Sequence, residues 1–246
     1  MKRIFTALLV AIAALCTLNT QARTFALVVG ISNYGDPDLN LTQPTNDAKA
    51  FRDILLTHTK DVTLLTSSYA TAGNIKEKLS AIVNRAQASD RIIFYYSGHG
   101  YPGGLYCYDS QYPYDQLVQL LSTSKAGEVV VFIDACHAGT IGGEVGDASN
   151  WYNGIEAVKG HAYFLGCRPE EYSIAAGYYQ KSFFTVGLLT GYRGKADTNH
   201  DRKVTIMELF KHIYKDCVRR SDGSQHPVLI APSTMHDTIL IEYPEE

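Results

Sequence analysis

The fold of this chain is decided by Tyr95-Tyr96-Ser97-Gly98-His99-Gly100 and, further along, by Ile133-Asp134-Ala135-Cys136-His137-Ala138-Gly139. Each stretch ends a run of apolar, β-branched or aromatic residues, and each run stops at small residues. This pattern is typical of a buried strand that ends at the edge of a sheet. One ending presents a histidine and the other a cysteine, the pair required when an imidazole activates a thiolate nucleophile.

The sequence around these two stretches alternates between strand and helix patterns. We expect strands at Phe25–Ile31, Val62–Leu65, Asp90–Ser97, Val129–Ile133 and Ala162–Gly166, and helices from Asn46-Asp47 to about Leu56, at Thr71–Arg85, Tyr114–Leu121 and Ile206–Val218. Such alternation predicts an α/β fold, a parallel sheet with helices on both faces. The helical crossover between the third and fourth strands makes them parallel, so His99 and Cys136 should be neighbours at the edge where ligands of such sheets bind.

Length and composition set the limits of this interpretation. The chain has 246 residues, of which 46% are hydrophobic and 19% are charged. It is long enough to bury one sizeable core, and one domain is the default expectation.

The N-terminal residues have the pattern of a targeting segment. Lys2 and Arg3 precede the apolar run Ile4–Leu18, and Thr20-Gln21-Ala22 places small residues at the positions that signal peptidase inspects. We therefore expect residues 1–22 to be a signal peptide, 23–246 to be the folded domain, and the product to be periplasmic or secreted. The alternative is an N-terminal membrane anchor, for which the run is short.

Cleavage before Arg23 would also change the charge of the protein. It takes the formal net charge from −3 to −5, which argues against nucleic acid as a partner. No membrane contact is expected after cleavage.

Four cysteines remain in the expected mature chain. Cys107, Cys136, Cys167 and Cys217 have neither CxxC nor zinc-site spacing, and we expect Cys136 to be free. The alternative for Cys136 is a small buried apolar residue. The strand before it and the histidine upstream favour a nucleophile.

Glycines beside the histidine leave room for a backbone oxyanion site. An N–H group near Gly98 or Gly100 and the amide of Cys136 are the candidate donors. No side chain is placed to orient His99, so that role falls to a backbone carbonyl or to an unknown group. His137 is a competing base, but alternation along an extended segment turns it away from Cys136.

These motifs make the chain resemble the caspase-fold cysteine peptidases of clan CD and peptidase family C14, within the metacaspase-like and bacterial caspase-like branch. The resemblance runs from about Thr24 to the C-terminus, and Leu27–Ile31, Tyr34 and Asn46-Asp47-Ala48 support it. It implies a caspase-like, flavodoxin-like αβα sandwich. It also implies a catalytic dyad of His99 and Cys136, with an oxyanion hole made by Gly100 and the Cys136 amide.

The resemblance also carries an expectation about the substrate. In metacaspase-like enzymes, the residue corresponding to Asp134 lines the S1 pocket and selects Arg or Lys, which a buried carboxylate explains physically. The alternative is that Asp134 only ties loop amides together. Pro169 stands where a second pocket aspartate is usual.

Three neighbouring residues complete the expected substrate site. Glu170 or Glu171 is a candidate substitute for the missing aspartate, although Arg168 beside them could neutralise the pocket. Ser173 corresponds to a serine of the family, and an acidic residue that usually follows it is absent.

A separate constellation resembles a calcium-binding loop. Asp197, Asn199, Asp201, the carbonyl of Lys203, and Glu208 provide oxygen atoms at the spacing of such a loop. Arg202 stands where the turn normally has glycine. Bound Ca²⁺ and a plain turn that enters the following helix both remain open.

Three functions therefore compete. The first is an exported endopeptidase that needs no cofactor for its chemistry, with Ca²⁺ as a possible ligand and proteins or peptides as substrates. The second is a caspase-fold binding or regulatory module without turnover. The third is a transpeptidase or ligase that uses the same dyad, in which a different acceptor reaches the intermediate. The oligomeric state is left open.

Overall fold

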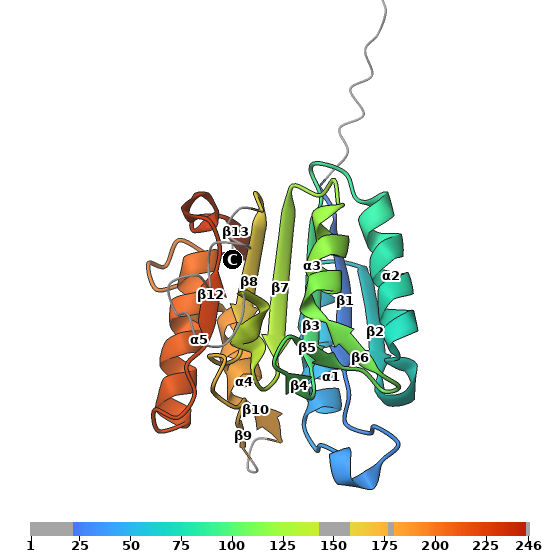
Figure 1. Ribbon diagram of the computed structural model, residues 1–246. Helices are drawn as coiled ribbons and strands as arrows, with labels where there is room; N and C mark the ends of the chain where they lie inside the picture. Colours follow the sequence, from blue (N-terminus) through green and yellow to red (C-terminus); the bar gives the residue numbers. More distant parts are fainter. Residues whose placement is uncertain (1–21, 143–157, 177–179, 245–246) are drawn as a thin grey trace, which may run out of the picture.

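The structure is a computed structural model that describes residues 22–142, 158–176 and 180–244. The expected signal peptide lies outside these residues, apart from Ala22. A six-stranded sheet in the order β12-β8-β7-β3-β1-β2 forms the centre of the molecule (Figure 1). Its strands are β1 (Thr24–Gly30), β2 (Asp61–Thr66), β3 (Arg91–Ser97), β7 (Glu128–Asp134), β8 (His161–Leu165) and β12 (Val228–Ile230). All pairings are parallel except that of β12 with β8, so the predicted parallel sheet is confirmed with one antiparallel edge strand.

Helices cover both faces of this sheet. One face carries α1 (Pro44–Leu55), α4 (Phe183–Thr190) and α5 (Ile206–Arg220), and the other carries α2 (Ala72–Arg85) and α3 (Tyr114–Ser122). Alternate strand residues point to opposite faces, which divides the core in two. Phe51 of α1 and Leu209 of α5 belong to one half, and Leu79 of α2 and Leu117 of α3 belong to the other. The expected three-layer arrangement is confirmed.

Smaller elements extend the fold beyond the central sheet. They are the sheet of β4 (Gly100–Tyr101), β5 (Gly104–Tyr106) and β6 (Gln111–Pro113), the pair β9 (Ala175–Ala176) and β10 (Lys181–Ser182), and the pair β11 (Lys203–Thr205) and β13 (Ile239–Glu242). Short helical turns span Pro37–Leu39, Ser67–Tyr69, Ala138–Gly142, Gly191–Lys195 and Ser233–Met235. The sheet β4–β6 and the pair β9–β10 both lie toward the end of the molecule where β3 and β7 finish (Figure 1).

The start of α1 differs from the sequence-based expectation. Asn46 and Asp47 were expected as caps, but the helix begins at Pro44, with Gln43 as the N-cap. Proline is favoured at the first helical position because its fixed φ suits the helix and its missing N–H has no helical partner there. A Cβ atom on Gly30 would lie 2.4 Å from the carbonyl oxygen of Pro44, so a glycine at the end of β1 lets the helix start close to the sheet. Asp47 consequently lies inside the first turn and is buried.

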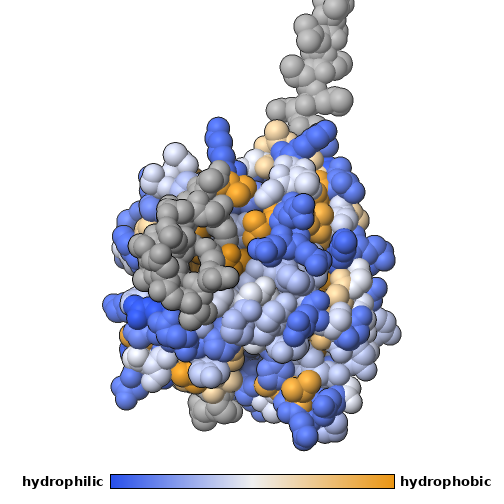
Figure 2. All heavy atoms as spheres, viewed as in Figure 1, coloured by the Kyte–Doolittle hydropathy of each residue, from blue (hydrophilic) through white to orange (hydrophobic). Residues whose placement is uncertain are grey.

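The outer surface over α2 and α3 is mostly hydrophilic, with apolar residues in small separate patches (Figure 2). Among the described helices, none combines the length and the apolar character needed to cross a bilayer.

Candidate active site

The register of the sheet brings the two decisive stretches together. Ser97 at the end of β3 pairs with Asp134 at the end of β7, so His99 and Cys136 each follow the paired residues by two positions. The two loops also touch, because a Cβ atom on Gly100 would lie only 2.3 Å from the carbonyl oxygen of Cys136. Only glycine permits this approach. The histidine and the cysteine are therefore neighbours at one edge, as the topology predicted.

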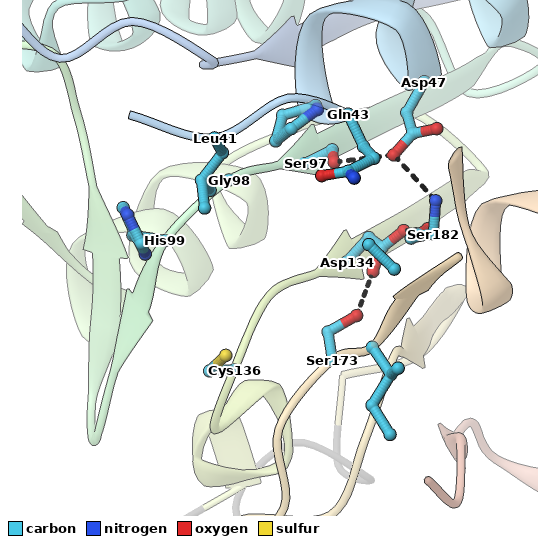
Figure 3. Close-up of a pocket in the computed structure, with 13 residues that line it drawn as sticks. Leu41, Gln43, Asp47, Ser97, Gly98, His99, Asp134, Cys136, Ser173 and Ser182 are labelled. Atoms are coloured by element: carbon cyan, nitrogen blue, oxygen red, sulfur yellow. Dashed lines mark hydrogen bonds between the residues drawn. The ribbon is translucent and has the colours of Figure 1, made fainter. Parts of the chain in front are cut away.

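Both side chains line a single cavity of about 120 Å³ (Figure 3). Its walls come from the segment before α1, the first turn of α1, the ends of β3 and β7, and the loop before β9. The lining residues are Leu41, Gln43, Pro44, Asp47, Ser97, Gly98, His99, Asp134, Cys136, Ser173, Ile174, Ala175 and Ser182. The cavity is therefore an acidic and hydroxyl-rich recess beside a possible nucleophile and base.

A backbone carbonyl orients the imidazole of His99. The Nε2 atom lies 2.8 Å from the carbonyl oxygen of Leu39. Because a carbonyl only accepts hydrogen bonds, Nε2 carries the proton and donates it. Nδ1 of the neutral ring is then the basic nitrogen. The orienting group that the sequence could not identify is thus the main chain at Leu39.

Two tyrosines fix the backbone of His99. Its N–H donates to the hydroxyl oxygen of Tyr34 at 2.7 Å, and the hydroxyl of Tyr96 lies 2.8 Å from its carbonyl oxygen. The Tyr34 ring also packs beside the imidazole, with ring centres 5.0 Å apart. A Cβ atom on Gly98 would lie 2.6 Å from both hydroxyls, which explains the glycine. No pattern in the sequence indicates this pair of hydrogen bonds, although Tyr34 is one of the residues that support the family resemblance.

The thiol of Cys136 is half-buried at the floor of the site. Burial raises its pKa, the backbone N–H of Ser173 opposes this by hydrogen bonding to the sulfur, and nearby Asp134 raises it further. The resting sulfur is therefore mainly a thiol at neutral pH. A base must remove its proton before it can act as a nucleophile.

The other cysteines of the described chain are free and buried. Cys167 lies below the Cys136 loop, where its thiol is within 3.3 Å of the carbonyl oxygens of Ala135 and Glu171. Burial raises the pKa of Cys167 to about 12. His161 cannot assist it, because His161 begins β8 while Cys167 follows the end of that strand. Burial also lowers the pKa of His161 to about 4.

The competing base, His137, is directed elsewhere. Its backbone has a φ of 56°, and its Nδ1 lies 2.6 Å from the carbonyl oxygen of Pro169, to which it donates. Its ring packs edge-on against the exposed Tyr172, with ring centres 5.3 Å apart. His137 is not among the residues that line the cavity. The geometry therefore favours His99 as the partner of Cys136.

Asp134 lies in the cavity wall and is almost completely buried. Its carboxylate accepts hydrogen bonds from the hydroxyls of Ser173 at 2.5 Å, Thr185 at 2.6 Å, and Ser182. Figure 3 shows the contact with Ser173. Burial nevertheless raises its pKa, because these bonds offset only part of the desolvation. Asp134 thus holds loops together through their hydroxyls and also presents negative potential to the cavity.

Asp47 is the site residue that sequence reasoning missed. Its Oδ2 accepts two long hydrogen bonds of 3.3 Å, from the Ser97 hydroxyl and the Ser182 N–H (Figure 3). Its Oδ1 is buried without a partner among the described residues. Burial, and then the nearby Asp134, raise the pKa of Asp47 to about 8. Asp47 belongs to the Asn46-Asp47-Ala48 stretch that supports the family resemblance. Only the position at which α1 begins shows that the Asp47 side chain faces the cavity.

The structure places Glu170 and Glu171 outside the cavity lining. The Glu171 carboxylate lies 2.7 Å from Nδ1 of His226 and accepts the His226 N–H at the same distance. Arg168 lies 3.9 Å from it. Glu171 therefore serves as an anchor for its loop. Ser173, by contrast, does line the cavity.

Gln225 also holds in place the loop that contains Ser173 and Ile174. Its side chain is fully buried, donates to the carbonyl oxygen of Gly166 at 2.7 Å, and accepts the Ile174 N–H at 2.9 Å. It also lies 3.4 Å from the Ser173 hydroxyl. The loop that contacts both Asp134 and the Cys136 sulfur is thus fixed by side chains distant in sequence.

The candidate calcium loop is occupied by its own hydrogen bonds. Asp197 accepts the Arg202 N–H at 2.9 Å, Asn199 accepts the Asp201 N–H at 2.9 Å, and Asp201 accepts the Lys203 N–H at 2.8 Å. Glu208 instead forms a capping box with Thr205 at the start of α5. Within the described part of the chain, no three His, Cys, Asp or Glu side chains gather as a metal site. Calcium binding stays a prediction.

Comparison with known proteins agrees with this geometry. The sequence profile of the family described as Caspase domain matches residues 23–238. Metacaspase-1 of Scheffersomyces stipitis is 27% identical over 151 residues, which cover 50% of this chain and 37% of that protein. The match thus spans little more than a third of that relative's length.

Solved structures resemble the chain over most of its length. A crystal structure of a Geobacter sulfurreducens protein matches with a TM-score of 0.66 and 18% identity, covering 91% of this chain and 100% of that one. Caspase-1 from Spodoptera frugiperda matches with a TM-score of 0.64 and 16% identity, covering 87% of this chain and 91% of that one. At such identities the likeness shows the fold, which is the expected caspase-like αβα sandwich.

Proposed function

Because this chain belongs to the caspase domain family, we propose that it is an exported cysteine endopeptidase that cleaves proteins or peptides after Arg or Lys. The observation that carries the specificity is the pair of buried carboxyl groups, Asp47 and Asp134, in the same cavity as His99 and Cys136. Two acids in a recess beside the nucleophile suit a cationic side chain at the residue before the cleaved bond.

The chemistry proposed for the dyad follows from the tautomer of His99. Nδ1 of the imidazole takes the proton from the Cys136 thiol, and the thiolate attacks the peptide carbonyl carbon. The resulting oxyanion accepts hydrogen bonds from the backbone N–H groups of Gly100 and Cys136. The imidazolium then gives its proton to the leaving amine as the C–N bond breaks. Water, deprotonated by the same imidazole, hydrolyses the thioester and restores the thiol.

The recognition step involves a proton as well as a charge. In the empty cavity, the pKa of about 8 keeps Asp47 largely protonated at neutral pH. A guanidinium or ammonium group that approaches the unpartnered Oδ1 favours the ionised carboxylate, so binding of the substrate releases this proton. A neutral or acidic side chain provides no such compensation.

Fluorogenic peptides that differ only in the residue before the cleaved bond test this proposal. We expect hydrolysis after Arg and Lys, no hydrolysis after Asp, and loss of all activity in Cys136→Ala. His99→Ala and His137→Ala are a matched pair, of which only the first should lose activity. Mass spectrometry of the products separates hydrolysis from transfer to an amine acceptor. Cleavage only after Asp, or full activity of Cys136→Ala, would refute the proposal.

Calcium binding by residues 197–208 is a separate proposal. We expect the Glu208 carboxylate to leave its hydrogen bonds with Thr205 and turn toward Asp197, whose Oδ1 is buried without a partner among the described residues. Calorimetric titration with Ca²⁺, compared with a Glu208→Gln variant, tests it. Heat of binding in the parent that is lost in the variant supports the site, and equal heats in both exclude it.

A further inference from the structure

The opposite edge of the sheet, where the parallel strands begin, contains a third buried carboxylate. Asp90 precedes β3, and only 2% of its surface is exposed. It lines a shallow cleft of about 280 Å³ with Ala22, Arg23 and residues at the starts of β3 and β7. Each strand of seven residues spans roughly 20 Å, so this cleft is far from the cavity that holds Cys136. No part of the proposed chemistry uses it.

The partners of Asp90 are neutral backbone donors. Its Oδ1 accepts the N–H of Arg23 at 3.0 Å, and its Oδ2 accepts the N–H of Gln87 at 2.9 Å. The nearest cationic group is the Arg23 guanidinium at 3.8 Å, on a side chain that is 54% exposed. A buried carboxylate is costly without a close, well-desolvated cation. The N–H group 3.0 Å from Oδ1 belongs to Arg23, and signal peptidase is expected to cleave the chain directly before this residue.

We propose that Asp90 is the binding site for the α-ammonium group that cleavage creates at Arg23. Hydrolysis of the Ala22–Arg23 bond adds water, leaves a carboxylate on Ala22, and gives the amine of Arg23, which takes up a proton. The neutral N–H that contacts Asp90 thereby becomes a cation at the same position. The inference rests on the proposed export and processing of the chain.

The neighbouring contacts already hold Arg23 in place for this role. Its carbonyl oxygen accepts the N–H of Arg91 at 2.8 Å, and its guanidinium lies 4.7 Å from the ring centre of Phe25. The ammonium therefore needs no rearrangement to reach Asp90. Charge-assisted hydrogen bonds are roughly twice as strong as neutral ones. Since β1 lies between β2 and β3, processing would fix the residue just before an inner strand, at a chain end that would otherwise fray.

The interaction has a defined pH dependence. The charged groups around this edge are Arg23, Asp61 at the start of β2, Arg85 of α2, and the pair Arg91 and Glu128, which lie 2.5 Å apart. A carboxylate partner raises the pKa of an α-ammonium above its usual value of about 8. The added stability is therefore present below about pH 8 and is lost as the pH rises through the folded-state value.

The test uses the exported protein itself. Intact mass determination gives the first residue of the mature chain. The rate at which acetic anhydride labels that residue's amine, read from the N-terminal peptide, is then compared for the native protein, the denatured protein, and the Asp90→Asn and Asp61→Asn variants. We expect a chain that begins at Arg23 and labels at least fivefold more slowly at pH 7.5 when native than when denatured. Asp90→Asn should abolish this protection, and Asp61→Asn should retain it.

The outcomes separate the inference from the proposals on which it rests. A different first residue overturns the processing and this site together, while the peptidase assays are unaffected. A chain that begins at Arg23 but labels equally fast in the native and denatured states overturns only the Asp90 site. The comparison of native with denatured parent protein needs no variant, so it stands even where Asp90→Asn fails to fold. Protection that survives in folded Asp90→Asn also overturns the assignment.

Discussion

Asp90 and Asp47 are buried carboxyl groups at opposite edges of one sheet, and their surroundings differ. Each oxygen of Asp90 has a backbone N–H within 3.0 Å. Asp47 has two long contacts on one oxygen and none, among the described residues, on the other. Buried acceptors without partners are rare, because each loses its hydrogen bonds to water and forms no hydrogen bond in the folded protein. We infer from this difference that Asp90 stabilises the fold, whereas Asp47 is available to bind a ligand.

For the residues of this comparison, the largest effect is expected when the charge of Asp47 is removed. Asp47→Asn keeps the shape and the Ser182 contact but deletes the negative charge opposite a bound Arg side chain. We predict that kcat/KM for a peptide with Arg before the cleaved bond falls by roughly 100-fold, since an unpaired buried charge costs several kcal/mol. Steady-state kinetics with the purified variant measure this. An unchanged kcat/KM would remove Asp47 from the substrate site.

The same substitution should stabilise the empty protein. The pKa of Asp47 is raised to about 8 in the folded state, above its ordinary value of 3.8. The folded state therefore holds this proton more tightly, and the parent protein loses stability as the pH rises from about 4 to 8. Asp47→Asn lacks this loss, so its advantage should grow by roughly 5 kcal/mol across that range, at about 1.4 kcal/mol per pH unit. Urea unfolding at pH 5 and pH 8 measures the difference in the free energy of unfolding between the two proteins. A parent protein that becomes more stable relative to the variant at pH 8 would contradict the prediction.

Asp90 should behave in the opposite way. In Asp90→Asn, the amide nitrogen must face either the Arg23 or the Gln87 N–H, which places two donors against each other. We predict a loss of about 1–3 kcal/mol in the free energy of unfolding, with kcat/KM of the folded fraction unchanged. Asp61→Asn, at a half-exposed position of the same edge, is the control and should change stability by less than about 0.5 kcal/mol, since Asp61 forms only a surface ion pair with Arg85. Equal effects of both variants would contradict the role of Asp90.

The smallest of these effects concerns the hydrogen bonds that fix the backbone of His99. Tyr34→Phe removes the acceptor at 2.7 Å from the His99 N–H while retaining the ring beside the imidazole. We predict that kcat falls by roughly fivefold to tenfold, the equivalent of one hydrogen bond, while KM changes little. Measuring kcat and KM across pH 6 to 9 distinguishes this from a general loss of folding. A change confined to KM would indicate that Tyr34 acts on substrate binding instead.

The edge that holds the site could be predicted from the sequence because its signals are local. Strand runs that end at Ser97 and Asp134, with a crossover between them, fix the position of His99 and Cys136 through topology alone. Ser173 was found through the family pattern. The parallel sheet and helices α1, α2, α3 and α5 followed from the same alternation of patterns, whereas α4 and the order of the strands did not.

The remaining features depend on contacts between distant residues. Leu39 bonds to His99 through a carbonyl, which carries no sequence signature. The direction of Asp47 depends on the turn at which Pro44 starts α1, and a shift of the helix start would point it elsewhere. Glu171 looked like a pocket acid, but its partner His226 lies 55 positions away. Hydrogen-bond partners that lie far apart in the sequence are set by the three-dimensional fold, so they cannot be predicted from the sequence alone.

The most direct test of the account compares two peptides that differ only in charge, one with Arg and one with citrulline before the cleaved bond. The two side chains have nearly the same shape, so the ratio of their kcat/KM values isolates the attraction between Asp47, Asp134 and the guanidinium. We expect Arg to be preferred by roughly 100-fold at pH 8, with most of this preference lost in Asp47→Asn, where only Asp134 remains to attract the guanidinium. Equal kcat/KM values for both peptides would contradict it.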